Sequence, residues 1–133
     1  MTEHDEAVAL VETLDLMNIS LWHIPQETFT PHWGVKMRNK KEGVRKGISD
    51  YLIYLPSERC KLKKGILLWI ELKKPRNRKK SGEFCALSSD GITIYPEQED
   101  FIKKMNTVGN VQGQICFGAE EAVAFVQNFL LKS

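Results

Sequence analysis

The sequence has few of the residues that build disulfide frameworks or transition-metal centres. It contains three cysteines and three histidines, and the histidines show no HxxH spacing. Widely separated cysteines without a CxxC pair argue against both a disulfide scaffold and a thiolate zinc site. The same scarcity argues against a histidine-based metal nuclease. The cysteines, which we expect to be reduced, are Cys60, Cys85 and Cys116.

Long hydrophobic runs are also missing. No apolar segment approaches the roughly 20 residues that span a bilayer, and the N-terminus is charged where a signal peptide would be apolar. We therefore expect a cytoplasmic protein without a membrane partner. With 133 residues, 42% of them hydrophobic and 27% charged, the chain suits one globular domain over residues 1–133. We see no internal repeat and no linker.

A net charge of only +2 gives little indication of partners, but its distribution is uneven. Residues 36–46 hold six basic side chains against one acid, and residues 73–80 hold six and no acid. The first 27 residues lean acidic. Two basic stretches of this kind can meet a polyanion such as DNA. A solvated charged loop is an equally good interpretation of either stretch alone.

Hydrophobic periodicity predicts one α/β domain with a mixed sheet flanked by helices, in the order αβ(α)ββαβα. Thr2 is a suitable N-cap for the first helix. The last predicted strands and helices are separated by turn residues. The predicted helices cover residues 3–17, 35–42, 96–108 and 119–131, and the predicted strands cover residues 21–24, 50–55, 66–74 and 111–117.

The segment at about 76–95 is the least regular part of the pattern. Two short apolar runs, 84–87 and 92–95, flank Ser88-Ser89-Asp90-Gly91. Asp-Gly between apolar runs is a hairpin signal. We therefore expect a hairpin insert within residues 76–95, with its turn at Asp90 and Gly91.

The two central strands bring polar residues together at one end of the sheet. The short connection 56–65 predicts an antiparallel pair. If residue 55 faces residue 66, then Asp50 faces Glu71, because both pairs of numbers have the same sum. Lys73 is two residues beyond Glu71, so its side chain leaves the same face of the strand.

Three ionisable groups in this arrangement suit phosphodiester hydrolysis. A hard divalent cation neutralises charge on the phosphate and lowers the pKa of an attacking water. Carboxylates are the usual protein ligands for Mg²⁺, and Mn²⁺ accepts similar oxygen ligands. A lysine beside them can orient or deprotonate water. The alternative is an ordinary ion pair between Glu71 and Lys73 or Lys74.

The residues around these positions resemble a known family. Residues 43–50 (GVRKGISD), 69–75 (WIELKKP) and 96–98 (PEQ) closely resemble the VRR-NUC nucleases of the PD-(D/E)XK, restriction-endonuclease-like superfamily. Residues 3–6 and 23–25 extend the resemblance to the stand-alone VRR-NUC proteins of phages and prophages, so it covers nearly the whole chain. It implies a restriction-endonuclease-like fold and a bacterial host cell.

The resemblance also implies roles for individual residues. Asp50 and Glu71 match the metal ligands, Lys73 the catalytic lysine and Gln98 the glutamine that supports the site. Glu3, or less favourably Glu6, matches the N-terminal acid that completes the metal site. Both acids could equally be first-turn residues that favour the helix dipole.

Departures from the family pattern are limited. Ser49 replaces the more usual proline, Gln26 stands where asparagine is common, and residues 76–95 are longer than the usual connection. Basic residues on either side of the motif are expected to bind DNA phosphates. These candidates are Arg45, Lys46, Lys74, Arg76 and Arg78.

The expected function is a Mg²⁺- or Mn²⁺-dependent, structure-selective endodeoxyribonuclease acting on branched DNA, with no small-molecule cofactor. A Holliday-junction resolvase is one candidate, because a homodimer supplies the paired cuts that a two-fold junction needs. A flap or nicking nuclease is another. A non-catalytic nucleic-acid-binding module is the alternative of a different class, and it predicts salt-sensitive binding without metal dependence.

Overall fold

A four-stranded mixed sheet forms the centre of the computed structural model, which describes residues 2–25, 33–43 and 45–131. The strands lie in the order β1-β2-β3-β4; β1 to β3 are antiparallel neighbours, and β4 is parallel to β3. This confirms the predicted α/β fold class. The strands are β1 (Ser20–His23), β2 (Tyr51–Leu55), β3 (Ile66–Lys73) and β4 (Val111–Phe117).

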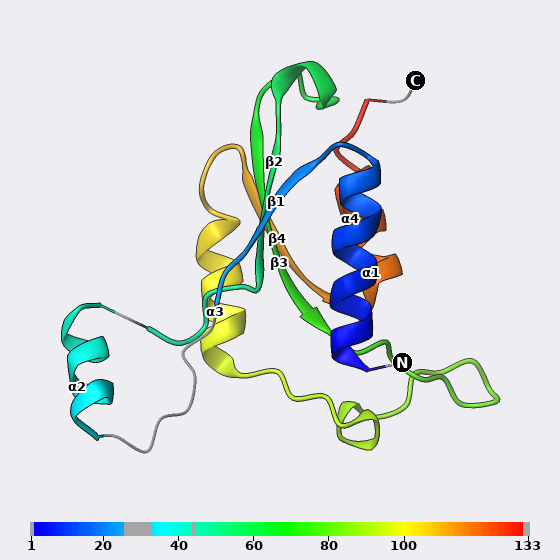
Figure 1. The fold of residues 1–133 in the computed structure, drawn as a ribbon. Helices are drawn as coiled ribbons and strands as arrows, with labels where there is room; N and C mark the ends of the chain where they lie inside the picture. Colours follow the sequence, from blue (N-terminus) through cyan, green and yellow to red (C-terminus); the bar gives the residue numbers. More distant parts are fainter. Residues whose placement is uncertain (1, 26–32, 44, 132–133) are drawn as a thin grey trace.

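Helices cover both faces of the sheet. Helices α1 (Glu3–Leu16) and α4 (Ala119–Gln127) pack together on one face, and α3 (Pro96–Met105) packs on the other, mainly against β4 (Figure 1). Helix α2 (Trp33–Lys41) stands away from the sheet in the same view. The element order agrees with the predicted αβ(α)ββαβα.

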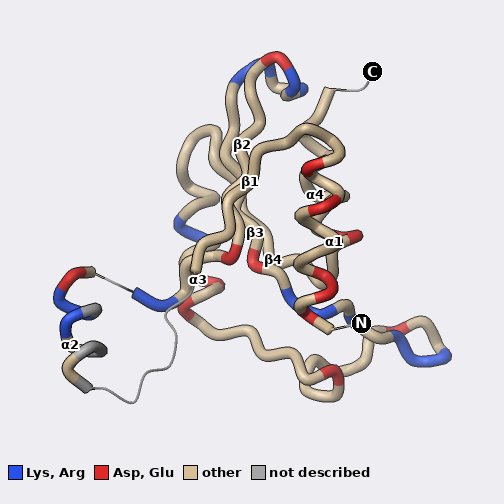
Figure 2. The backbone as a smooth tube through the Cα atoms, viewed as in Figure 1, with Lys and Arg blue, Asp and Glu red and all other residues tan. Residues whose placement is uncertain are grey.

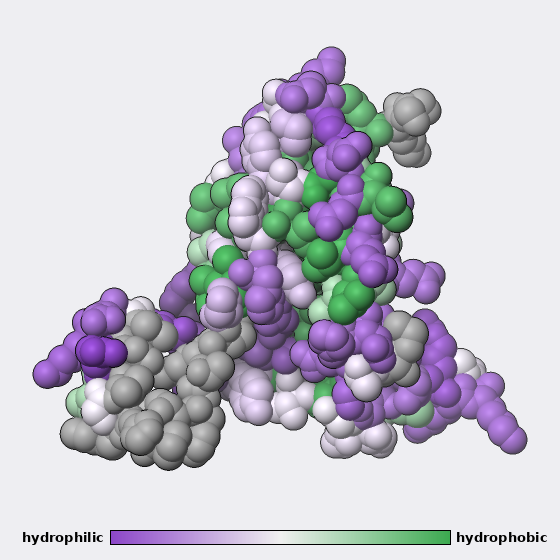
Figure 3. Space-filling model, viewed as in Figure 1, coloured by the Kyte–Doolittle hydropathy of each residue, from purple (hydrophilic) through white to green (hydrophobic). Residues whose placement is uncertain are grey.

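The hydrophobic core lies between the sheet and the α1–α4 layer. Alternate residues of β2 and β3 point into it, as the period of a strand requires, and they meet Leu10 and Leu14 of α1. Apolar surface remains over the upper body of the molecule, whereas α2 and the loop after β3 are mostly hydrophilic (Figure 3). Within the described ranges, no helix is long and apolar enough to cross a membrane.

The register of β2 and β3 is the one predicted from the sequence. Leu55 pairs with Ile66 and Tyr51 pairs with Ile70 in antiparallel orientation. The next step along the chain brings Asp50 beside Glu71. The first helix is also as predicted, because Thr2 caps it: the Thr2 Oγ1 accepts a hydrogen bond from the Asp5 amide at 3.1 Å.

The hairpin predicted around Asp90 and Gly91 is wrong. Residues Leu87–Asp90 form a 3-10 helix, and Gly91 ends it with a φ of 71°. The Asp90 carboxylate accepts hydrogen bonds from the Asn77 amide nitrogen at 3.1 Å and from the Asn77 side chain at 2.8 Å. Asp90 therefore ties the segment back to its start, and the tight turn lies earlier, where Arg78 and Phe84 form an isolated bridge.

The C-terminal ends of two helices also differ from the prediction. Helix α3 ends at Met105, so Val108 lies beyond it and is half exposed. Helix α4 ends at Gln127, and Leu130 instead forms a bridge to Cys60. In both cases apolar residues continued the helical spacing past the last helical residue, which is where sequence patterns define boundaries least well.

Candidate active site

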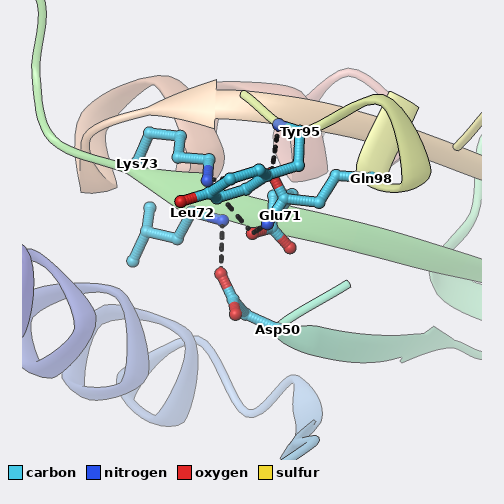
Figure 4. Close-up of polar contacts among 6 residues, drawn as sticks. All are labelled: Asp50, Glu71, Leu72, Lys73, Tyr95 and Gln98. Atoms are coloured by element: carbon cyan, nitrogen blue, oxygen red, sulfur yellow. Dashed lines mark hydrogen bonds and ion pairs between the residues drawn. The ribbon is translucent and has the colours of Figure 1, made fainter. Parts of the chain in front are cut away.

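Three predicted residues meet where β2 begins and β3 ends (Figure 4). Asp50 lies immediately before β2, and Glu71 and Lys73 are within the last three residues of β3. The pairing of β2 with β3 stops at Tyr51. Beyond it, the Asp50 Oδ2 accepts a hydrogen bond of 2.8 Å from the Leu72 amide. The carboxylate of Asp50 thus takes the place of a backbone partner for β3 and is fixed beside Glu71.

Gln98 joins Glu71 and Lys73 into one network (Figure 4). Its Nε2 donates to the Glu71 Oε1 at 2.8 Å, and its Oε1 accepts from the Lys73 Nζ at 3.0 Å. The Tyr95 amide also donates to the Gln98 Oε1, at 3.1 Å. The Lys73 Nζ lies 3.5 Å from the Glu71 Oε1. The four residues expected in the catalytic set, including Asp50, are therefore brought together.

The start of α3 delivers Gln98 to this network. Pro96 stands at the beginning of the helix, where a missing N–H costs nothing, and Gln98 reaches back to the Tyr95 amide as in a capping box. Gly47 allows the loop before β2 to approach the start of α3 closely. It is buried with a φ of 100°, and a Cβ there would lie 2.5 Å from the Glu97 carbonyl oxygen. Only glycine fits this close approach.

The electrostatics of the centre are unfavourable without a further positive charge. Glu71 is only 3% exposed. Burial and the neighbouring Asp50 charge raise the pKa of Glu71 to about 7, although the Lys73 ammonium opposes this. Burial also raises the pKa of Asp50, against the hydrogen bond from Leu72, and the Glu3 charge adds to the increase. Two carboxylates at close quarters resist ionisation together.

The donor set of the centre suits a hard divalent cation. The Glu71 Oε2 is buried and meets no hydrogen-bond partner among the described residues. A buried carboxylate oxygen in this state is costly unless a ligand completes it. Over residues 2–25, 33–43 and 45–131, no three acidic, histidine or cysteine side chains are already grouped as a metal cage. Two carboxylates with retained waters are the arrangement that Mg²⁺ commonly takes.

Glu3 and Glu6 differ in what they contact. Glu3 lines a pocket of about 270 Å³ with Asp50, and also a pocket of about 220 Å³ with Lys73. Glu6 is buried instead, and its Oε2 accepts a hydrogen bond of 3.2 Å from the Ala119 amide at the start of α4. Glu6 therefore stabilises the packing of α1 on α4, which leaves Glu3 as the N-terminal acid beside the centre.

The similarity of this chain to known proteins lies in its fold. No family model matches the sequence, and no curated protein matches it. A solved structure described as a VRR_NUC domain protein matches with a TM-score of 0.62 and 16% sequence identity, over 97% of this chain and 88% of that chain. The chain shares the fold of that protein. At this identity the likeness establishes the arrangement of the elements and no more.

Two residues of the site were not selected from the sequence. His4 and His23 line the pocket of about 270 Å³ beside Asp50. His23 pairs with Tyr51 in the β1–β2 register, and their rings lie 5.2 Å apart. The register of β1 against β2 places His23 next to the start of β2. The connection between these two strands is long, so this register could not be predicted from the sequence.

The predicted DNA-binding residues fall into two groups. Lys74 lines the pocket of about 220 Å³ with Glu3 and Lys73, so it lies beside the centre. Arg45 and Lys46 are exposed on the loop before β2, and Arg45 also donates to the Lys40 carbonyl at 2.8 Å. The remaining two, Arg76 and Arg78, are outside the network and contact the loop that follows β3. Gln26 lies outside the described residues.

Proposed function

We propose that the protein is a metal-dependent endodeoxyribonuclease that hydrolyses phosphodiester bonds at the Asp50–Glu71–Lys73 centre. The observation that carries the proposal is the buried Glu71 carboxylate, which keeps one oxygen without a hydrogen-bond partner among the described residues. A structural ion pair would need no such oxygen, and burying it costs stability. The VRR_NUC fold and the order of the motifs support the same proposal.

Asp50 and Glu71 are the proposed ligands of Mg²⁺ or Mn²⁺, with Glu3 completing the site. When bound, such an ion neutralises phosphate charge and makes water a better nucleophile. Glu71 is held by Gln98, and Asp50 is held by the Leu72 amide, so the two carboxylates are oriented before any ligand arrives. Fixed ligands lose little entropy on binding.

Lys73 is the proposed catalytic cation. Its Nζ lies near both the Glu71 Oε1 and the Gln98 Oε1, and Lys73 as a whole is only 9% exposed. A buried ammonium of this kind can donate a hydrogen bond to a phosphate oxygen as negative charge develops. It can also take part in proton transfer with the attacking water or the leaving oxygen. Gln98 positions both Glu71 and Lys73.

The proposed substrate is branched DNA, with junction resolution by a homodimer as the preferred reaction. A two-fold junction requires paired cuts, which a symmetric dimer provides. Flap cutting and nicking use the same centre and are distinguished only by substrate. A binding module without catalysis would rely on the basic residues of α2 and the loops (Figure 2), but it leaves the buried carboxylates without a purpose.

The test is one gel series. Wild-type protein and Glu71→Ala are incubated with four-way, flap and linear duplex DNA in Mg²⁺, Mn²⁺ or EDTA. The matched control is Glu12→Ala, an exposed acid of α1. We expect the wild type and Glu12→Ala to cut in the presence of metal, most rapidly on the four-way substrate, and Glu71→Ala to be inactive.

Different outcomes contradict different parts of the proposal. Cleavage that persists in EDTA, or in Glu71→Ala, would contradict the metal centre. Salt-sensitive binding without cleavage by the wild type would instead support the binding module. Sedimentation of the free and DNA-bound protein tests the dimer, and a monomer in both states would contradict junction resolution by a homodimer.

A further inference from the structure

The loop of residues 77–85, which follows β3, is internally bonded and projects from the body of the molecule (Figure 1). Its backbone closes through hydrogen bonds from Cys85 to Asn77 at 2.8 Å and from Lys79 to Glu83 at 2.7 Å. The Asn77–Asp90 contacts fix its base. A loop that satisfies its own backbone in this way can present side chains in a defined arrangement.

Two arginine guanidinium groups contact one aromatic ring at this loop. The guanidinium of Arg78 lies 3.9 Å from the centre of the Phe84 ring, and that of Arg76 lies 4.4 Å from the same centre. Hydrogen bonds to carbonyl oxygens hold both arginines, from Arg78 to Gly82 at 2.7 Å and from Arg76 to Cys85 at 3.0 Å. Phe84 is nevertheless 46% exposed. The exposed part of this ring and the guanidinium planes beside it remain available for stacking.

The two arginines and Phe84 line a groove of about 320 Å³. Phe117 also lines it, and its ring centre lies 5.5 Å from the Arg76 guanidinium. The first turn of α4 contributes Glu120 and Glu121 to the lining. The groove therefore combines aromatic rings and guanidinium planes with carboxylates.

The charges select which part of a nucleotide would enter. Carboxylates repel phosphate but accept hydrogen bonds from ring N–H and exocyclic amino groups, so the Glu120 and Glu121 side favours a base. Lys79 and Lys80 are exposed, and Figure 2 shows basic positions in blue on this loop. Phosphates are favoured there. The arrangement matches a nucleotide whose base is turned into the groove and whose backbone passes the loop tip.

The groove adjoins the proposed active centre. Phe117 pairs with Lys73 across β3 and β4, and Arg76 follows Lys73 by three residues. A base in the groove would thus belong to a nucleotide close to the bond that is cut. Bases in a regular duplex are stacked in the helix and are not available to such a groove, whereas unpaired bases can leave the stack.

We propose that the groove between the 77–85 loop and α4 binds an unpaired nucleobase next to the cleavage position, by stacking on Phe84 and its two arginines. This inference rests on the proposed nuclease function and specifies its substrate as DNA with an unpaired nucleotide near the scissile bond. The insert then contributes selectivity for DNA structure, while the Asp50–Glu71–Lys73 centre supplies the chemistry.

The test measures binding in EDTA, so that cleavage plays no part. Two duplexes of the same sequence carry 2-aminopurine, one in a single-nucleotide bulge and one in a base pair. We expect wild-type protein to quench the bulged probe. Phe84→Leu should weaken binding of the bulged duplex about tenfold, the size of one lost aromatic–base stack, and leave the paired duplex unchanged. Phe84→Trp, which keeps a ring, should restore both quenching and affinity.

Variants of the loop tip separate stacking from charge. Lys79→Ala with Lys80→Ala should weaken both duplexes equally, because phosphates are present in each. Equal loss for both duplexes in Phe84→Leu, no loss for either, or no quenching by the wild type would overturn the inference. Metal-dependent cleavage by the wild type, together with unchanged bulge binding in Phe84→Leu, would contradict the base site and leave the nuclease proposal intact. Binding that depends on Phe84, without any cleavage, would support the base site and contradict the nuclease proposal.

Discussion

Two polar regions lie only three residues apart in the chain, and they are built in opposite ways. In the proposed active centre, Glu71 and Lys73 are buried on β3 and are held by side chains, with one carboxylate oxygen lacking a partner among the described residues. In the 77–85 loop, Arg78 and its neighbours donate to backbone carbonyls and lie at the surface. The loop stabilises its own fold, whereas the centre carries an electrostatic cost that a ligand would remove.

Replacing Lys73 should separate the two regions most clearly. Lys73→Met removes the buried cation beside Glu71, so we expect cleavage to slow by about 10²- to 10⁴-fold, the usual size of a lost acid–base group. Single-turnover rates on the preferred DNA provide the measurement. Lys104→Met, an exposed residue of α3, is the control. Similar rates for both variants would show that the centre does not act through its lysine.

The pH dependence of stability should come from the centre and not from the loop. The folded pKa of Glu71 is raised from 4.5 to about 7, so the folded state holds a proton that the unfolded state has lost between these values. In EDTA, the free energy of unfolding should therefore fall as the pH rises from 4.5 to 7, by up to about 3 kcal/mol, and stay level above. Urea denaturation of the wild type and Glu71→Gln tests this, and equal pH slopes would contradict it.

Gln98 should affect activity through the residues it positions. Gln98→Ala removes the contacts to Glu71, Lys73 and the Tyr95 amide. Outer-shell partners of a metal site are typically worth about 10- to 100-fold in activity or metal affinity. The metal concentration at half-maximal rate should rise in this variant. Gln127→Ala, at the end of α4, is the control, and an equal response in both variants would reject the positioning role.

The smallest effect is expected in the loop. Arg78→Ala removes one half of the stack on Phe84, and exposed cation–π contacts are worth about 0.5–1 kcal/mol. We expect a loss of stability of that size with an unchanged pH slope. Denaturation at two pH values in EDTA is the measurement. An altered slope would show that the loop and the centre are electrostatically coupled, which would undo the comparison.

Sequence patterns were sufficient for the centre because its geometry is local to one strand pair. A short connection and two apolar strands fixed the antiparallel register, and that register placed Asp50 beside Glu71. The capping of α1 by Thr2 was also predictable, since it depends on neighbouring residues. Gln98 was found only through the resemblance to a family, because it comes from a helix far along the chain.

The remaining features depend on contacts that no local pattern contains. Asp90 and Gly91 have the sequence of a hairpin turn, yet the bond from Asn77 to Asp90 draws the segment into a different path. Glu3 and Glu6 are both acids in the first turn of α1, and only the packing of α4 on α1 assigns Glu6 to the Ala119 amide. The Arg–Phe stack likewise forms because the loop folds back on itself.

Calorimetric titration of Mn²⁺ into the metal-free protein at pH 7.5 tests the central claim most directly, since that claim is that Asp50 and Glu71 hold the ion. Wild type, Asp50→Asn, Glu71→Gln and the exposed control Glu12→Gln are compared. The predicted result is binding by the wild type and by Glu12→Gln, with a large loss of affinity in the other two. Equal binding by all four proteins, or no binding by the wild type, would contradict the account.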